Sequence, residues 1–186
     1  MKTFPMMRPL AGQKCLLVGG GTVALRKAEK LFSFGAAIYV CARECADFSL
    51  FGARVLRCDY HPRLLEGMDI AVAATDDRAI NARVAQDCRA RGIPVNSVDD
   101  VQNCDFFFPA LVVRGDVVVG ISTGGASPAL AAVVREYLEN CLPVGLEEVA
   151  LRAKELRGTI PAEEYKKKVR ELFYAALGQE GGHGKD

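Results

Sequence analysis

The sequence lacks an excess of charge of either sign. Its 24 Lys and Arg residues nearly balance its 23 Asp and Glu residues, for a formal net charge of +1. Global electrostatics therefore gives no reason to expect nucleic acid or an anionic membrane surface as a partner. Any anionic ligand must be held by local groups.

Long hydrophobic runs are also missing, although 50% of the residues are apolar. No run approaches the ~20 apolar residues of a membrane span. The opening stretch MKTFPMMRPLAGQK has no apolar segment of the length that a signal peptide needs. We expect a soluble, cytoplasmic protein with no membrane partner.

A metal-binding pattern is absent as well. The seven cysteines include no CxxC pair and no Cys/His cluster with the spacing of metal ligands. Cys41 and Cys45 form a CxxxC motif that could bind metal or sense redox, but no other ligands cluster near it. We expect no metal site, and most of the cysteines should be small buried hydrophobes.

What the sequence does contain is an alternation of short apolar runs with helical patterns. Strands are predicted at KCLLVGG, AIYVCA, ARVLRCDY, DIAVAAT and IPVNSV, and one helix places Ile80, Val84 and Cys88 on a single face. This alternation is typical of an α/β fold with a parallel sheet and crossover helices. It predicts a Rossmann-type domain over residues 1–109.

The pattern changes after residue 109. FFFPALVVRGDVVVGIS predicts a hairpin, and SPALAAVVREYLEN predicts a helix that Ser127 can cap. A hairpin and one helix cannot bury their own apolar faces, so residues 110–143 should form a small α+β domain that dimerises. We expect a helical domain over 144–178 and a disordered tail over 179–186. The helix predicted over SPALAAVVREYLEN has an apolar stripe at Leu130, Val133, Val134, Tyr137 and Leu138.

The first strand leads into the pattern Gly19-x-Gly21-x-x-Ala24. Between a strand and a helix, this pattern indicates a dinucleotide site. Gly19 permits the tight turn, Gly21 lets the backbone approach a pyrophosphate, and Ala24 allows close helix–strand packing. The helix start adds free amide groups and a partial positive charge.

The acidic residue usual about 20 residues later, for the ribose, is missing. Arg43 and Glu44 are the first charged residues there. Arg43 could favour the 2′-phosphate of NADP, whereas Glu44 could reach the ribose hydroxyls of NAD. The residues themselves leave both cofactors open.

Carboxylates follow two later strands at the sheet edge where ligands of open α/β folds bind. Thr75 and Asp76 can approach the cofactor, while Asp76 or Asp77 can cap the next helix. Asp99 follows the fifth strand and is a candidate general base, although an Asp in such a turn is often structural.

The segment STGGASP joins a strand to a helix through two glycines, and its amides could form a second anion site. The alternative is a turn with a helix cap. Two such loops suggest two ligands, a dinucleotide and an acidic substrate. The candidate substrate residues are Arg114, Ser122, Thr123, Gly124, Gly125 and Ser127.

Three segments, LLVGGGTVALRKAEKLFSFGA, AVAATDDRAINARVAQDCRARGIPVNSVDD and FFFPALVVRGDVVVGISTGGASPALAAVVREYLE, resemble the precorrin-2 dehydrogenase family in order and spacing. That family also supplies the first module of bacterial sirohaem synthase. The similarity covers about residues 5–143 and is specific, because GGGxVAxRKxxxL, AATDD and STGGxSPxLA occur together.

This resemblance implies oxidation of the tetrapyrrole precorrin-2 to sirohydrochlorin with NAD⁺ in a homodimer. It implies that Asp99 is the essential aspartate, that Thr22 and Val23 lie beside the cofactor phosphates, and that Arg43 and Glu44 lie at the adenosine ribose. Because the family manages without the usual acid, the resemblance favours NAD. Some members also insert Fe²⁺ into sirohydrochlorin, and the sequence leaves that activity open.

Two other functions stay open from the sequence. One is a non-catalytic NAD(H)-binding, redox-sensing dimer, although such a sensor would need neither Asp99 nor the STGGAS loop. The other is an NADP-dependent reductase of a different tetrapyrrole step, which only Arg43 favours.

Overall fold

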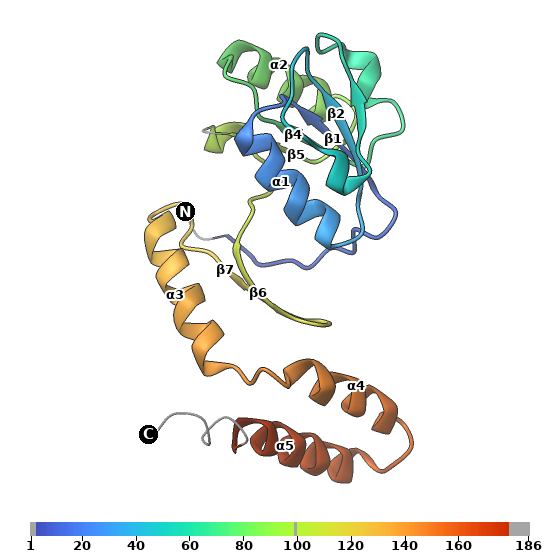
Figure 1. Ribbon diagram of the computed structural model, residues 1–186, viewed down its shortest axis with the longest axis vertical. Helices are drawn as coiled ribbons and strands as arrows, with labels where there is room; N and C mark the ends of the chain where they lie inside the picture. Colours follow the sequence, from blue (N-terminus) through green and yellow to red (C-terminus); the bar gives the residue numbers. More distant parts are fainter. Residues whose placement is uncertain (1–2, 99, 179–186) are drawn as a thin grey trace. The chain divides into compact units, whose positions relative to one another are not determined.

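The computed structural model describes residues 3–98 and 100–178, and most of its strands and helices are labelled in Figure 1. It divides into two units, a sheet unit of residues 7–107 and a hairpin–helix unit of residues 108–178 with residues 3–6. The strands are β1 Lys14–Val18, β2 Ala37–Cys41, β3 Arg54–Leu56, β4 Ile70–Ala73, β5 Val95–Ser97, β6 Ala110–Arg114 and β7 Val117–Ile121. The α-helices are α1 Thr22–Ser33, α2 Arg78–Arg89, α3 Pro128–Cys141, α4 Leu146–Leu156 and α5 Ala162–Gly178.

The sheet unit contains a five-stranded parallel sheet in the order β3-β2-β1-β4-β5. Helix α1 connects β1 to β2, and α2 connects β4 to β5 in the opposite direction across the sheet. Because such crossovers are right-handed, the two helices cover opposite faces. The predicted α/β fold with a Rossmann-like parallel sheet is confirmed.

The apolar residues of the central strands form the core of the sheet unit. Strand β1 buries Leu16, Leu17 and Val18, and all four residues of β4 are buried. Strands covered on both faces have continuous apolar runs rather than alternating ones, which explains why these segments could be recognised.

Helix α2 differs from its predicted face in one position. Ile80 is 37% exposed, whereas the neighbouring Asn81 is only 4% exposed. Val84 and Cys88 are fully buried, as the periodicity predicts. The buried face is therefore rotated toward Asn81, whose side chain serves the site described below.

The hairpin–helix unit begins with β6 and β7, which pair antiparallel from Ala110–Ile121 to Arg114–Val117. Helix α3 packs on this hairpin, and α4 packs on α5. Ser127 caps α3, accepting a hydrogen bond from the Leu130 amide at 3.1 Å. Of the predicted stripe on α3, Leu130, Val133 and Tyr137 are 54%, 60% and 67% exposed.

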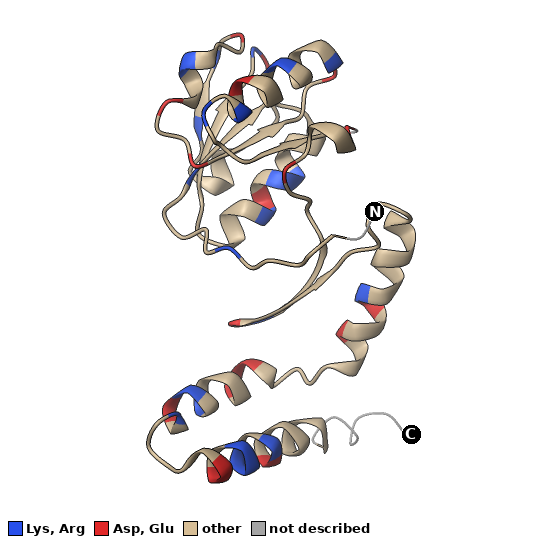
Figure 2. Ribbon diagram, turned by 180° about the vertical axis from the view of Figure 1, so that it is seen from behind, with Lys and Arg blue, Asp and Glu red and all other residues tan. Residues whose placement is uncertain are grey.

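Charges of both signs are dispersed over both units (Figure 2). Two lysines of α5 form ordinary helix-surface pairs, Lys166 with Glu163 at 2.8 Å and Lys168 with Glu171 at 3.2 Å. None of the helices in residues 3–98 and 100–178 is both long and apolar enough to cross a membrane.

Candidate functional site

A pocket of about 790 Å³ lies in the sheet unit, where β1 and β4 end. This size falls within the range of small-molecule and cofactor sites. The chain runs in opposite directions across the sheet from β1 and β4, so the pocket occupies the switch point where open α/β sheets bind ligands. Its lining residues are Gly19, Gly20, Gly21, Thr22, Val23, Glu44, Cys45, Ala46, Ala74, Thr75, Asp76, Arg78, Asn81 and Val98.

Each of the three consecutive glycines has a different physical reason to lack a side chain. Gly19 has a φ of +116°, and a Cβ there would lie 2.2 Å from the Ala74 carbonyl oxygen. A Cβ on Gly20 would lie 2.4 Å from the Glu44 carbonyl oxygen, whereas one on Gly21 would meet nothing within 4 Å. Gly19 and Gly20 therefore close the turn, and Gly21 leaves open space for a ligand. The role of Gly20 was missed from the sequence, although the run of three glycines was a visible signal.

The start of α1 forms one wall of this pocket. Its N-cap is Gly21, which offers no side-chain cap, and its first turn has no acidic residue. The first intrahelical hydrogen bond joins the Leu25 amide to the Gly21 carbonyl at 3.0 Å. The preceding amides of Thr22 and Val23 have no intrahelical acceptor, so together with the helix dipole they suit an anionic group. Open space and amide donors together fit the pyrophosphate of a dinucleotide.

The opposite wall is built by Thr75 and Asn81. Asn81 Oδ1 accepts hydrogen bonds from the Thr75 amide at 3.1 Å and from Thr75 Oγ1 at 2.8 Å, and Asn81 Nδ2 donates to the Thr75 carbonyl at 2.9 Å. The buried amide thus fixes both the backbone and the side chain of Thr75. This role of Asn81 was missed, because an Asn within a helix gives no sign in the sequence that it will be buried.

The two aspartates after β4 have different roles. Asp77 caps α2, with its Oδ1 accepting from the amides of Ala79 at 2.7 Å and Ile80 at 3.3 Å. Asp76 lines the pocket. The structure therefore resolves the two possible caps in favour of Asp77 and leaves Asp76 beside the ligand space.

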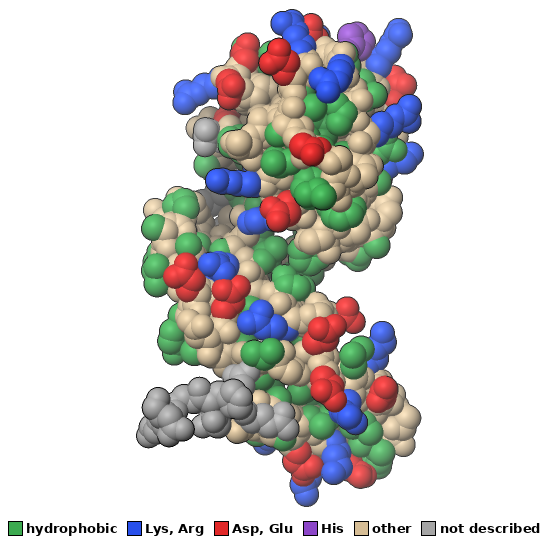
Figure 3. Space-filling model, viewed as in Figure 1, with side chains coloured by type: hydrophobic (Ala, Val, Ile, Leu, Met, Phe, Trp, Pro, Cys, Tyr) green, Lys and Arg blue, Asp and Glu red, His purple; other side chains and the backbone are tan. Residues whose placement is uncertain are grey.

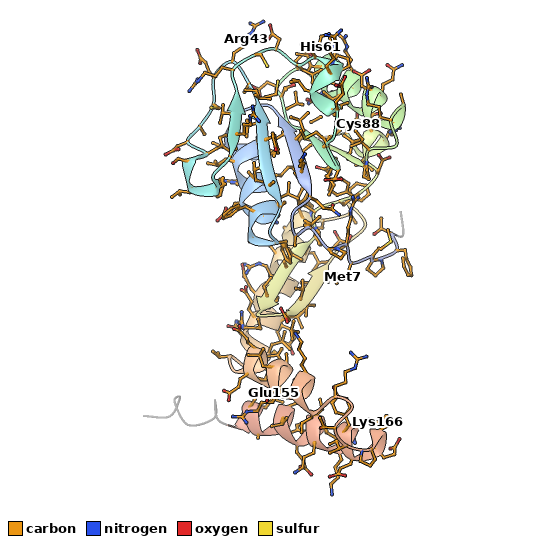
Figure 4. The ribbon with its side chains drawn as sticks, turned by 90° about the vertical axis from the view of Figure 1, so that its right-hand side faces the viewer. Met7, Arg43, His61, Cys88, Glu155 and Lys166 are labelled. Atoms are coloured by element: carbon orange, nitrogen blue, oxygen red, sulfur yellow. The ribbon has the colours of Figure 1, made fainter. Side chains whose placement is uncertain are left out.

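Arg43 and Glu44 are adjacent in sequence but differ in their relation to the pocket. Glu44 lines it. Arg43 lies at the surface of the sheet unit (Figure 4), and its guanidinium is bound to Asp59, with Nε 2.6 Å from Oδ1. This hydrogen bond holds the pKa of the Asp59 carboxyl below its ordinary value. Arg43 is therefore engaged outside the pocket lining.

Asp99, the predicted general base, lies outside the described residues. Val98 before it lines the pocket. Cys104 ties the segment after Asp99 to β5. Its Sγ accepts a hydrogen bond from the Ser97 amide at 3.2 Å and donates one to the Ser97 carbonyl at 3.1 Å. Burial raises the pKa of the Cys104 thiol, so it stays a neutral donor.

Asn96, also on β5, anchors this region to α1. The Lys27 ammonium donates to Asn96 Oδ1 at 2.9 Å, and Asn96 Nδ2 donates to the Phe106 carbonyl at 2.9 Å. These contacts join two segments that lie far apart in the sequence. Neither contact is predicted by the sequence pattern.

The STGGASP loop is closed by its own hydrogen bonds. Thr123 Oγ1 accepts from the Ser127 amide and donates to the Ser127 carbonyl, both at 3.1 Å. Ser122 Oγ accepts from the Gly124 amide at 3.2 Å. Gly124 and Gly125 have φ values of 63° and 83°, which explains the glycine pair. The loop therefore includes the turn and cap that were the alternative to an anion site.

Arg114 is separated from that loop within the hairpin–helix unit. Its Nη2 donates to the Glu139 carbonyl at 3.3 Å, near the C-terminal end of α3, whereas the loop precedes the N-terminal end. At about 1.5 Å per residue, Glu139 and Pro128, the first residue of α3, are roughly 16 Å apart along the helix. Arg114 and the loop therefore do not form one compact anion site within one chain. Arg135, on α3, is paired with Glu139 and Glu136.

Within the described residues, no group of three or more His, Cys, Asp or Glu side chains is arranged to hold a metal ion.

Two family models match the chain. One, described as putative NAD(P)-binding, matches residues 6–110, and the other, described as sirohaem biosynthesis protein central, matches residues 114–140. The first contains every residue that lines the pocket, and the second contains all of β7 and nearly all of α3.

Curated relatives share about two fifths of their aligned residues with the chain. Siroheme synthase from Chromobacterium violaceum is 42% identical over 167 residues, which are 87% of this chain and 36% of the relative. Siroheme synthase from Methylococcus capsulatus is 43% identical over 164 residues, which are 84% of this chain and 34% of the relative. The chain thus spans about a third of the length of these relatives.

A solved structure extends the similarity over the whole fold. SirC, a precorrin-2 dehydrogenase, superposes with a TM-score of 0.72 at 26% identity, covering 91% of this chain and 89% of SirC. Both units are therefore included in the similarity. The two family models agree with this, because one matches the sheet unit and the other matches part of the hairpin–helix unit. The chain belongs to the SirC-like family, which includes the N-terminal precorrin-2 dehydrogenase/ferrochelatase module of sirohaem synthase.

Proposed function

We propose that this protein oxidises precorrin-2 to sirohydrochlorin, with NAD⁺ as the hydride acceptor. The observation that carries the proposal is the similarity to SirC over nearly the full length of both chains. The pocket at the switch point supplies an independent physical reason, because its glycine turn and helix start suit a dinucleotide. The reaction removes a hydride and a proton from precorrin-2 and yields NADH.

Bound NAD⁺ would supply the hydride acceptor, and the chain must hold it and manage the proton. The amides of Thr22 and Val23 would bind the pyrophosphate beside the open space at Gly21. Thr75, fixed by Asn81, and Asp76 would line the opposite wall. The amides belong to the backbone of α1, and Thr75 is held by hydrogen bonds to the buried Asn81, so these parts of the pocket are formed before ligand arrives.

The choice of NAD over NADP is supported by the charges around the pocket. Glu44 lines it, and a carboxylate can accept hydrogen bonds from ribose hydroxyls but repels a 2′-phosphate. Arg43, the cation that could offset this repulsion, is bound to Asp59. We therefore propose NAD as the cofactor.

Asp99 is proposed as the base that takes the proton. Loss of a hydride from a reduced tetrapyrrole must be matched by loss of a proton, and one carboxylate suffices for that task. This role is supported by the position of Asp99 in the sequence, because it directly follows Val98, which lines the pocket.

A homodimer is proposed through α3. Leu130, Val133 and Tyr137 are all more than half exposed, and Figure 3 shows apolar side chains along this helix. Apolar side chains in such a row are typical of an interface. Ser122, Thr123, Gly124, Gly125, Ser127 and Arg114 are proposed to bind the substrate carboxylates, and the separation of Arg114 from the loop requires that they contact different carboxylates.

The test is anaerobic incubation of the purified protein with freshly generated precorrin-2 and either NAD⁺ or NADP⁺, followed by visible spectroscopy. We expect sirohydrochlorin to form with NAD⁺ and much more slowly with NADP⁺. Nucleotide binding without oxidation would overturn the proposal and support the redox-sensing dimer. Fe²⁺ added afterwards tests the second activity of the family, because a rate of sirohaem formation above the protein-free rate would identify Fe²⁺ as a further substrate.

A further inference from the structure

We propose that Cys41 and Cys58 are a redox modification site, a thiol pair that forms a reversible disulfide. Their Sγ atoms lie 3.9 Å apart, and the Cys41 Sγ also lies 3.4 Å from the Cys58 carbonyl oxygen. The proposal stands independently of the proposed catalytic function, because it rests on these two thiols alone.

The parallel pairing of β2 and β3 brings the two cysteines together. Cys41, the last residue of β2, lies opposite Leu56 in the register, and Cys58 follows Leu56 by two residues. The sequence instead draws attention to Cys45, which is four residues from Cys41. The structure selects Cys58, which is 17 residues away.

Only one of the two sulfurs needs to move for a bond to form. A disulfide requires the sulfurs to approach to about 2.05 Å, which is about 2 Å closer than they are here. Cys41 is 2% exposed in the sheet, whereas Cys58 is exposed in an irregular segment after β3. Rotation and a small shift at Cys58 can therefore close the gap while β2 keeps its position.

The different environments of the two thiols set the order of reaction. Burial raises the pKa of the Cys41 thiol to about 12, so very little thiolate forms there at neutral pH. Cys58 is open to solvent and reagents. Cys58 therefore reacts first, and Cys41 completes the bond.

The oxidant required is a low-molecular-weight disulfide such as glutathione disulfide. The Cys58 thiolate attacks one sulfur of that disulfide, forming a mixed disulfide and releasing one glutathione thiolate. Cys41 Sγ then attacks the Cys58 sulfur, its proton passes to the solvent, and the second glutathione thiolate leaves. Two protein thiols are oxidised, and one glutathione disulfide is reduced to two glutathiones.

The bond would form beside the candidate nucleotide pocket. The Cys41 carbonyl accepts a hydrogen bond from the Gly19 amide at 2.9 Å, so this residue supports the first glycine of the turn. Asp59, which binds Arg43, directly follows Cys58. The cross-link would fasten β2 to the segment after β3, which should raise the thermal unfolding midpoint of the sheet unit.

The test is incubation of the full chain with glutathione disulfide, followed by alkylation of free thiols, tryptic digestion without reductant and mass spectrometry. Trypsin cleaves after Arg43, Arg54 and Arg57, so Cys41, Cys45 and Cys58 leave on three different peptides. We expect the Cys41 and Cys58 peptides to be joined, with a mass 2 Da below their sum. Dithiothreitol should separate them.

Matched variants distinguish this pair from its alternatives. Cys45→Ser should keep the link, whereas Cys58→Ser and Cys41→Ala should abolish it. Cys58 is exposed, so its variant tests the proposal even if Cys41→Ala fails to fold. A Cys41–Cys45 link, or no link with glutathione disulfide, would overturn the proposal.

Discussion

Arg43 donates two hydrogen bonds to Asp59, from Nε to Oδ1 at 2.6 Å and from Nη2 to Oδ2 at 2.9 Å. The two side chains are 78% and 70% exposed, so the pair adds little to stability. The pair bears on the proposed choice of NAD, because Arg43 is bound to Asp59 and is not among the residues that line the pocket with Glu44.

Removing the carboxylate should therefore change nucleotide preference. In Asp59→Ala, Arg43 is free to reach a 2′-phosphate, and we expect the ratio of NADP⁺ to NAD⁺ affinity to rise by about 3- to 10-fold, or about 0.7–1.4 kcal/mol. Fluorescence titration with both nucleotides measures this ratio. The double variant Arg43→Ala/Asp59→Ala is the control and should show no such rise; an equal rise in both variants would contradict the role given to Arg43.

Gly20 should be replaceable only at a cost in stability. A Cβ there would lie 2.4 Å from the Glu44 carbonyl oxygen and 2.6 Å from the Cys45 Cβ. Gly20→Ala must shift this backbone and should lower the free energy of unfolding by about 1–3 kcal/mol. Urea denaturation measures the loss.

Gly21→Ala is the matched control for that prediction. Its φ is −78°, and a Cβ would meet nothing within 4 Å, so we expect a change in stability of about 1 kcal/mol or less. The added methyl group would instead occupy space meant for the pyrophosphate and should weaken nucleotide binding about 10-fold or more. Normal binding by Gly21→Ala would show that the ligand does not use this space.

Asn81→Ala should affect both stability and binding. It removes three hydrogen bonds between the buried Asn81 and the half-buried Thr75, a loss of about 1–3 kcal/mol in the free energy of unfolding. Nucleotide affinity should fall as the pocket wall loosens. Ile80→Ala, at the adjacent 37% exposed position, should cost about 1 kcal/mol or less; similar losses in the two variants would argue against the Asn81 contacts as the cause.

Asp99→Asn tests the proposed base. If the carboxylate takes a proton during oxidation, the variant should bind NAD⁺ within about twofold of the wild type but lose about 10²-fold or more in turnover. Anaerobic assays with precorrin-2 measure turnover, and titration measures binding. A wild-type rate in the variant would remove Asp99 from the mechanism.

Val133→Arg tests the proposed dimer surface. Val133 is 60% exposed on α3, and a charge placed there would be buried without a partner if two copies pack through this helix. We expect the wild type to sediment as a dimer and the variant as a monomer. Leu50→Arg makes a similar change at an 83% exposed position of the sheet unit and should stay dimeric. A monomeric wild type would contradict the proposal.

Local pattern determined much of the fold. Continuous apolar runs such as CLLV and IAVA identified the buried parallel strands, because strands covered on both faces need no polar side. The glycines placed the turn between β1 and α1, and Ser127 marked the start of α3. Each of these signals acts over a few neighbouring residues, so it can be recognised without knowing the rest of the fold.

The tertiary structure alone decided which distant residues meet. The partners Arg43–Asp59, Cys41–Cys58 and Thr75–Asn81 all depend on which strands are adjacent or on how a helix is rotated against the sheet. Strand order and helix rotation are set by packing of the whole unit rather than by the residues beside each partner. For this reason the sequence determined the parallel sheet and the glycine turn, whereas only the packed structure showed that Arg43 is bound to Asp59 and that Cys58, not Cys45, faces Cys41.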